Sequence, residues 1–405
     1  MWLFKLAWKN IWRNRNRTLI SISAIFFAVV FSVVANSLWK GTFGALIQNL
    51  VGYYSGYIQV HQKGYWDEQV LDNSLVWTDT LEKLLGSDPN ISAFTPRLES
   101  FALISSGDIT KGCLVAGIDP EKEIEVTRLP DRLKEGEYLA AGDHAILISE
   151  GLAEQLNLGL RDTVYIIGQG YHGATAAGKY PIKGILEYGS PDLNSKLAFL
   201  PLAQARELYG TENHATSCVL SLHNQNRLEE TTVSLKSRLG ESLEVMSWKE
   251  MMPEIVQHMR SDNFSMQVVQ FILYLLIAFG IFGTLTMMMV ERQFEMGMLI
   301  AIGMKKINMI LLMVIESVFT VITGCVIGLI VSIPIAFYFK KHPIRFGGEF
   351  GEAYERFGFE AAMPGSTAPG IFLSQGLIVL CIGLLLSLYP LYKIIRLNPV
   401  KAMRN

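Results

Sequence analysis

Apolar and polar positions follow two patterns along this chain, one long and one short. On the long scale, four apolar runs cover residues 18–40, 268–290, 307–339 and 370–391. Each run is long enough to cross a hydrocarbon core of about 30 Å, which takes roughly 20 apolar residues in a helix. The pattern predicts an α-helical membrane protein with four transmembrane helices, in which residues 41–267 form a large domain between the first and second helices.

On the short scale, residues 41–267 alternate between strand-like and helix-like spacing. A first block, which ends near Asp131, and a third block, from Ala215 to Trp248, both mix strands with helices. Between them a second block, about residues 134–212, repeats strand and helix patterns of its own. We expect an α+β domain in which the first and third blocks form one unit and the second block is an inserted subdomain.

The second transmembrane helix is expected to start well before its apolar run. Ser247 and Glu250 have the spacing of a capping box, and Pro253 is tolerated in a first helical turn. From there to Val290 only isolated glycines interrupt the helical pattern. About 43 residues at 1.5 Å each span roughly 65 Å, about twice the hydrocarbon core, so we expect a rigid stalk below the domain.

Residues 1–17 predict an amphipathic helix that lies at the membrane surface, with tryptophans at the level of the headgroups. Its apolar face consists of Phe4, Trp8, Ile11 and Trp12. Its basic face consists of Lys5, Lys9 and Arg13. A secretory signal with a cleavage site at Ala35–Ser37 is the alternative, but the apolar run is longer than the about 7 to 15 residues of a signal peptide.

The short segment 291–306, between the second and third transmembrane helices, leaves no room for a folded domain. At helical spacing its apolar side chains gather on one side; they are Phe294, Met298, Leu299, Ala301 and Ile302. Acids come first and lysines last, the order that complements a helix dipole. Gly297 and Gly303 each cost about 1 kcal/mol relative to alanine, which indicates close approach by another group. A connector that lies on the lipid headgroups remains the alternative.

The distribution of charge sets the predicted orientation. Half of the residues are hydrophobic and 18% are charged, and the net charge of −2 says nothing about partners. Basic residues without acids precede the first helix and fill the basic tail, residues 392–405. By the positive-inside rule both termini and segment 291–306 are cytoplasmic, whereas residues 41–267 and the short loop 340–369 lie outside. We expect no nucleic-acid partner.

Two candidate chemistries in the external domain are not supported by their surroundings. The run from Gly173 to Lys179 satisfies the start of a P-loop, but Tyr180 stands where a Mg²⁺-binding Ser or Thr is needed, and a strand follows instead of a helix. His61 has no second ligand at metal-binding spacing. We therefore expect no catalytic residues and no metal. Whether Cys113 and Cys218 pair stays open.

The third helix carries two polar or small-residue features. Gly324 and Gly328 form a G-x-x-x-G pattern that permits close helix packing, either among the four helices or with a second subunit. Glu316 lies within the apolar run, where a buried acid needs a partner. We expect structural pairing inside the chain or across a dimer, because no second intramembrane ionisable residue supports a proton relay.

One pattern in segment 291–306 resembles a known family. The motif E-R-x-x-E-x-G-x-L-x-A-x-G directly follows a transmembrane helix and consists of Glu291, Arg292, Glu295, Gly297, Leu299, Ala301 and Gly303. It resembles the coupling segment of ABC transporter permeases of the FtsX, MacB and lipoprotein-releasing (Lol) superfamily. The entry LAWKNIWRNRNRTLI and the tail from Asn398 to Arg404 resemble the same superfamily.

The resemblance implies a transporter subunit of the bacterial inner membrane. It implies that the coupling segment docks on a separate ABC ATPase subunit that binds the ATP, so the chain needs no cofactor or ATPase site of its own. It also implies a second permease subunit, in a homo- or heterodimer, and porter-like and Sabre-like parts in the external domain. The entry of that domain favours a Lol-type permease with lipoprotein cargo and a periplasmic carrier.

Three alternatives stay open within this resemblance and beside it. They are a MacB-like efflux permease, an FtsX-like regulator of cell-wall hydrolases that transports nothing, and a membrane receptor without any ATPase. The large two-part external domain disfavours the regulator.

Overall fold

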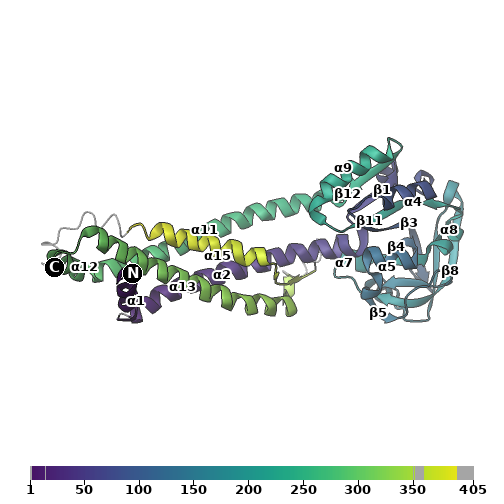
Figure 1. The fold of residues 1–405 in the computed structure, drawn as a ribbon. Coiled ribbons are helices and arrows are strands. Elements are labelled where there is room, and N and C mark those ends of the chain that lie inside the picture. The colour runs from purple at the N-terminus through teal and green to yellow at the C-terminus, as the bar shows by residue number, and fades with distance from the viewer. Residues whose placement is uncertain (1, 14, 350, 352–359, 390–405) are drawn as a thin grey trace. The chain divides into compact units, whose positions relative to one another are not determined.

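The computed structural model describes residues 2–13, 15–349, 351 and 360–389. It divides into two compact units (Figure 1). The helical unit comprises Met1–Gly44, Met259–Ile344 and Ala362–Asn405, and the sheet unit comprises Ala45–His258 and Arg345–Ala361. The predicted basic tail, with the motif that ends at Arg404, lies outside the described residues.

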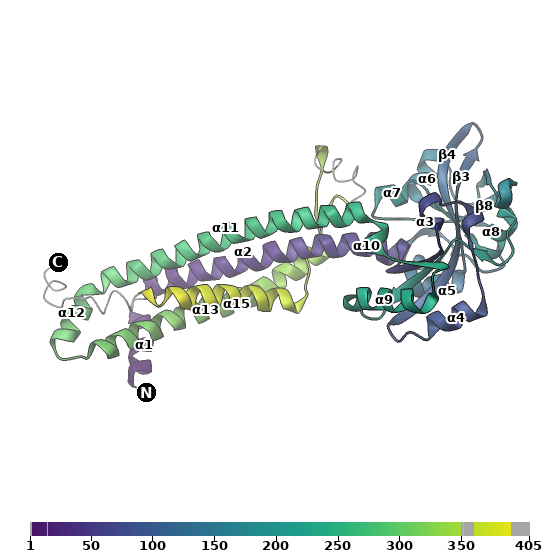
Figure 2. The same cartoon turned by 90° about the horizontal axis from the view of Figure 1, so that it is seen from above.

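The helical unit is built from long apolar helices that run alongside one another (Figures 1 and 2). Its helices are α1 (Trp2–Arg13), α2 (Arg15–Ile47), α11 (Pro253–Glu291), α12 (Gln293–Ala301), α13 (Lys306–Lys341) and α15 (Pro369–Leu386). Within the described part of the chain, four helical stretches are long and apolar enough to cross a membrane: Thr18–Ser55, Pro253–Glu291, Lys306–Lys341 and Pro369–Leu386. Large apolar side chains such as Phe271 and Phe279 are exposed on them, as expected for surfaces that face lipid.

Two predicted boundaries need correction. The capping box at Ser247 and Glu250 is present, but it starts the four-residue helix α10 (Trp248–Met251) and not the long helix. Met252 leaves the helical conformation, so α11 begins at Pro253 and has 39 residues. At the other end of the chain, Arg15–Arg17, predicted as part of the surface helix, belong to α2.

Small and polar residues join the long helices to one another. A Cβ atom on Gly324 would lie 2.8 Å from the Cβ of Ile25, and one on Gly328 would lie 2.8 Å from the Cβ of Val29. The G-x-x-x-G pattern therefore packs against α2 of the same chain. The buried amide of Gln375 in α15 accepts hydrogen bonds from Ser32 in α2 and from Tyr274 in α11, the latter at 2.6 Å.

The sheet unit is organised on one large sheet, whose strand order is β12-β1-β11-β3-β4-β9-β6-β8-β5, with β7 pairing β3 and β8. Its strands are β1 (Ile58–Gln62), β3 (Ile91–Ser106), β4 (Ile109–Ile118), β5 (Leu133–Gly136), β6 (Ile146–Ser149), β7 (Thr163–Gln169), β8 (Thr175–Leu186), β9 (Leu197–Pro201), β11 (Ser217–Leu222) and β12 (Leu243–Ser247). A further pair in this unit is β2 (Leu75–Val76) with β10 (His214–Ala215). The chain also pairs β13 (Ile344–Arg345) with β14 (Ala362–Met363), and β14 belongs to the helical unit. The last pair adds strands to the region predicted as a plain loop, 340–369.

Short helices connect these strands. They are η1 (Gln48–Ser55), α3 (Tyr65–Glu68), η2 (Leu71–Asn73), α4 (Asp79–Gly86), α5 (Pro120–Thr127), η3 (Leu129–Arg132), α6 (Glu150–Leu156), η4 (Tyr171–Gly173), α7 (Pro191–Asn194), α8 (Leu202–Tyr209), η5 (Gln225–Arg227) and α9 (Leu228–Leu239). η1 is a π-helix, a rare form.

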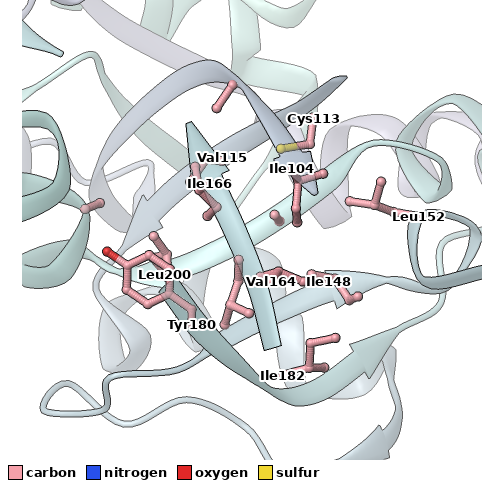
Figure 3. Close-up of a cluster of buried hydrophobic side chains, with 14 of the residues drawn as sticks. Ile104, Cys113, Val115, Ile148, Leu152, Val164, Ile166, Tyr180, Ile182 and Leu200 are labelled. Carbon is pink, nitrogen blue, oxygen red and sulfur yellow. The ribbon is translucent and has the colours of Figure 1, made fainter. Parts of the chain in front are cut away.

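The strand order shows how the second block, predicted as an insertion, joins the strands of the first and third blocks. Strands of the first and third blocks interleave in β12-β1-β11-β3-β4, and strands of the second block follow them as β9-β6-β8-β5. The parallel pair β4–β9 and the antiparallel pair β3–β7 join the two groups, so the blocks share one sheet. Their core is shared as well: Cys113 and Val115 of the first block pack with Ile148 and Val164 of the second (Figure 3).

The structure also places the glycine-rich run from Gly173 to Lys179 and the cysteines of the sheet unit. Gly178 and Lys179 lie in β8, paired with Ile166 and Tyr165 of β7, so this glycine-rich run is part of a hairpin and not of a strand–helix P-loop. Cys113 and Cys218 are both buried and unpaired. Burial raises the pKa of the Cys113 thiol to about 12, which makes it a poor nucleophile.

Candidate coupling site

The motif residues of segment 291–306 form a short helix between two breaks. Arg292, with φ −97° and ψ 5°, separates α11 from α12. After α12, Gly303 adopts φ +109°, a conformation that L side chains rarely adopt. α13 then starts after an extended Lys305. Gly303 is therefore needed for the turn itself, which the close-approach argument from sequence did not foresee.

One face of α12 is apolar and exposed. Phe294 is 55% exposed, Met298 41% and the adjoining Ile302 77%. The opposite face is covered: Met296 and Gly297 are buried. The exposed residues are those that the helical spacing grouped on one side, and we call Phe294, Met298 and Ile302 the apolar stripe. An exposed apolar stripe on a short helix is typical of a surface that another protein or a membrane covers.

A buried ion pair lies directly beside this helix. The guanidinium of Arg292 donates a hydrogen bond to the carboxylate of Glu316 in α13, and both side chains are buried. The same guanidinium donates to the main-chain oxygen of Asn10 in α1 at 3.3 Å. The side-chain amide of Asn10 donates to the second carboxylate oxygen of Glu316 at 2.8 Å. We call these three residues the polar cluster; it joins α1, the start of α12 and α13.

A second ion pair between α1 and α12 is exposed. Arg13 donates to Glu295 at 2.7 Å, with side chains that are 56% and 43% exposed. Exposed ion pairs contribute about 0–1 kcal/mol, because water screens both charges. The buried polar cluster and this exposed pair thus connect the same two helices in very different surroundings.

The predicted site residues separate into a group at or near the surface and a group that is buried. Glu295 is half-buried, Ala301 is exposed, and Leu299 is partly buried against the methionine-rich core. Arg292, by contrast, points inward and cannot offer its charge to a partner protein. Glu316 pairs with Arg292 inside the chain.

Sequence reasoning missed Asn10 and the pairing of Arg292 with Glu316. Asn10 lies in α1 within the run LAWKNIWRNRNRTLI, but its place in that run does not indicate a partner. The signal for the pair was available: one basic residue at the end of α11 and one acid about three turns into α13, on neighbouring helices. Only the three-dimensional structure shows that Arg292 and Glu316 contact each other.

The described residues contain no group of three or more His, Cys, Asp or Glu side chains that could hold a metal ion. His61 is buried, and one ring nitrogen contacts the main-chain oxygen of Thr216 at 3.0 Å. Burial lowers the pKa of this histidine, which favours the neutral ring as a hydrogen-bond donor to that oxygen.

Comparison with known families identifies the class of protein. A model described as the MacB-like periplasmic core domain matches residues 18–238, and one described as the FtsX-like permease C-terminal matches residues 268–399. The first match alone covers more than half of the chain. The chain therefore belongs to the ABC transporter permease family that carries these two regions, and the predicted membership is confirmed.

Individual relatives agree with this assignment. The chain is 20% identical over 332 residues to the lipoprotein-releasing system transmembrane protein LolC of Xylella fastidiosa, which covers 78% of this chain and 79% of that protein. It is 22% identical over 404 residues to the macrolide export ATP-binding/permease protein MacB of Nitrobacter winogradskyi, which covers 96% of this chain and 58% of that protein. Such homologues belong to ABC transporter systems that work with ATPase subunits.

A solved structure, the periplasmic region of MacB from Actinobacillus actinomycetemcomitans, is 15% identical with a TM-score of 0.36. It covers 51% of this chain and 94% of that one.

Proposed function

We propose that this chain is the permease subunit of an ABC transporter and couples ATP hydrolysis by a separate ATPase subunit to movement of its external domain. The observation that carries the proposal is α12, a nine-residue helix between two helices long enough to cross a membrane, with Phe294, Met298 and Ile302 exposed. The apolar stripe is the surface that docks on the ATPase subunit, and Glu291 and Glu295 supply charge beside it.

The orientation follows from charge. Basic residues without acids surround the start of the chain, so both termini and α12 face the cytoplasm of a bacterial inner membrane and the sheet unit faces the periplasm. This is the orientation in which α12 can reach an ATPase. A second permease subunit completes the transporter, as a homo- or heterodimer.

Movement would travel along α11. This helix is continuous for 39 residues, from Pro253 to Glu291, and helices of that length bend only gently unless a proline or an inserted group breaks them. Inside the sheet unit, the chain that follows α2 is fastened firmly: the Tyr54 hydroxyl donates to Glu99 at 2.7 Å, and the Arg132 guanidinium lies 4.0 Å from the Tyr53 ring centre. The main-chain oxygen of Tyr57, just before β1, accepts a hydrogen bond from the main-chain N–H of Trp248, just after β12, at 3.0 Å. The segment that follows α2 and the segment that precedes α11 therefore meet beside the paired strands β1 and β12.

For cargo we propose lipoproteins, which the external domain extracts from the membrane and passes to a periplasmic carrier. The match to a lipoprotein-releasing protein over 79% of that protein's length favours this cargo. Export in the manner of MacB is the second candidate, favoured by a match over 96% of this chain.

Co-purification from detergent tests the proposed coupling. We expect the wild-type chain to bring down an ATPase subunit and the Met298→Asp variant to lose it, because a charge in the apolar stripe opposes docking. Phe101→Asp is the matched control: Phe101 is 61% exposed in the sheet unit, so the same change there leaves the ATPase bound. Equal recovery with all three chains would reject the docking surface.

Depletion of the chain then separates the cargoes. Lipoprotein release predicts that lipoproteins accumulate in the inner membrane. Export predicts normal lipoprotein sorting together with dependence on an outer-membrane exit duct, and that result would reject the lipoprotein proposal.

A further inference from the structure

Buried ion pairs rarely stabilise a protein more than an apolar pair of the same size would, because both charges lose their hydration. The pair of Arg292 and Glu316 is buried to 6% and 1% exposure, so its stability contribution alone does not explain it. What an ion pair can supply is a defined register, since the planar guanidinium fork accepts few geometries. Here one fork contacts two different helices, α13 through Glu316 and α1 through Asn10.

The apolar surroundings of the polar cluster do not define a register by shape. The core that joins α1, α12 and α13 is rich in methionine; its buried members are Ala7, Met289, Met296, Met309, Ile310, Leu312 and Met313. Methionine is unbranched, has three rotatable side-chain bonds and adapts to irregular gaps, so it tolerates several packings. A methionine-rich core would therefore let α12 slide or rotate unless another contact fixes it.

The polar cluster lies where this freedom would be greatest. Arg292 is itself the break between α11 and α12, so its backbone is outside both helices. The side chain of α1 that reaches the cluster, Asn10, is on the same helix as Ala7, which is fully buried in the methionine-rich core. The three elements α1, α12 and α13 thus share one polar contact point inside an adaptable apolar core.

We propose that Asn10, Arg292 and Glu316 are positioning residues that hold α12 in a fixed register against α1 and α13. Force applied to α12 then moves these helices together and is not dissipated by local sliding. The inference rests on the proposed coupling function for its consequence, but the fixed register itself is a property of this chain alone. The surface helix α1 becomes a working part of the coupling site and not only a membrane anchor.

Distance measurement by electron paramagnetic resonance tests the register directly. Spin labels are placed at Lys9→Cys in α1 and Met298→Cys in α12 of the full-length protein in lipid nanodiscs. The exposed Cys381 is replaced by Ala so that it takes no label. The test variant is Arg292→Met with Glu316→Leu, which removes both charges and leaves no unpaired buried ion. The matched control is Arg13→Ala with Glu295→Ala, the exposed pair between the same helices.

We expect one narrow distance in the parent and in the control, and a broad or two-peaked distribution in the test variant. A parent-like distribution in the test variant would overturn the proposal. Thermal unfolding in the same nanodiscs shows whether the variant is folded. If it is not, Asn10→Ala carries the test, because it removes only the contact of α1 with Glu316; a distribution identical to the parent would then overturn the proposal.

Complexes with the ATPase subunit provide the second readout. In the test variant we expect kcat for ATP to fall by about tenfold with the KM for ATP unchanged, since the nucleotide site is on the other subunit. An unchanged kcat in a folded, assembled complex would overturn the role in coupling. If the wild-type chain binds no ATPase, the proposed function fails, whereas the spin-label result still decides on the register.

Discussion

Among the residues that the structure describes, each unit contains a buried arginine–glutamate pair, and the two pairs are built differently. In the sheet unit, Arg97 of β3 donates twice to Glu123 of α5, at 2.6 and 3.2 Å, and Thr127 donates to the same carboxylate at 2.6 Å. In the helical unit, Arg292 divides its hydrogen bonds between Glu316 and Asn10 on two different helices.

The surroundings of the two arginines differ as well: Arg97 has further polar and aromatic neighbours, whereas Arg292 lies beside a methionine-rich core. Around Arg97, the carboxylate of Glu99 lies at 3.4 Å and the ring of Tyr54 at 5.0 Å. Burial alone would lower the pKa of Arg97, yet the carboxylates of Glu123 and Glu99 raise it above its ordinary value. The pair of Arg292 lies at a helix break in a methionine-rich core. The same ion pair therefore occurs in two settings: the Arg97–Glu123 pair, which we call the fixed joint, is held by several polar partners of the sheet unit, whereas the Arg292–Glu316 pair supplies the defined contact in an adaptable apolar core.

The largest expected effect comes from breaking the fixed joint. Arg97→Ala leaves Glu123 buried without its partner, so we expect a loss of about 3–5 kcal/mol in the free energy of unfolding. Hydrogen exchange should rise first in β3 and α5. An Arg97→Met, Glu123→Leu variant is the control, since it removes both charges and should lose much less. Wild-type exchange in Arg97→Ala would contradict the fixed joint.

The next effect concerns the contact between α2 and α13, the helix that carries Glu316. Gly324→Ala places a Cβ atom 2.8 Å from the Cβ of Ile25, so α2 and α13 must separate. Overpacking of this kind costs about 1–3 kcal/mol, measured by thermal unfolding in detergent. At Gly280 an added Cβ meets nothing within 4 Å, so Gly280→Ala should cause no loss. Equal stability of the two variants would show that α2 and α13 are not closely packed.

A smaller effect follows from pH and is confined to the sheet unit. Burial lowers the pKa of His61, so the folded protein binds this proton less readily than the unfolded chain. The stability it contributes is complete above the ordinary histidine pKa of about 6.5 and is lost as the pH falls below that value toward the folded-state pKa. Denaturant unfolding at pH 7 and pH 5 should show the loss. The loss should shrink in His61→Gln; an equal loss in that variant would assign it to other groups.

The smallest effect is expected at the exposed pair. Arg13→Ala should change the free energy of unfolding by less than about 1 kcal/mol, because Arg13 and Glu295 are 56% and 43% exposed. Unfolding curves at low and high salt provide the check, since screening should abolish what difference there is. A loss comparable to that of Arg97→Ala would remove the distinction between exposed and buried joints.

Periodicity predicted the elements well because the apolar residues on the buried face of a helix or strand recur at the spacing of that element. The apolar runs, the strands of all three blocks and the one-sided pattern of α12 were readable in this way. The break at Met252 was not, because the capping box at Ser247 fits a helix of any length. Nor could sequence show that Arg292 turns inward, since spacing places a residue on a face without naming what lies opposite.

Long-range polar partners were missed for the same reason. Gln375 joins three helices through Ser32 and Tyr274, and Asn10 completes the polar cluster, yet nothing in the sequence around either residue indicates these partners. Each becomes meaningful only once distant helices are side by side. The motif residues were found because they are close together in sequence, and their partners were not because they are far apart.

Cross-linking from α12 in native membranes tests directly whether α12 docks on an ATPase subunit. A cysteine at Met298, 41% exposed in the apolar stripe, is compared with one at Ile330, 62% exposed on the apolar helix α13. With an ABC ATPase subunit co-expressed, we expect a cross-linked product from position 298 and none from position 330. No product from position 298, or equal products from both positions, would contradict α12 as the ATPase-coupling helix.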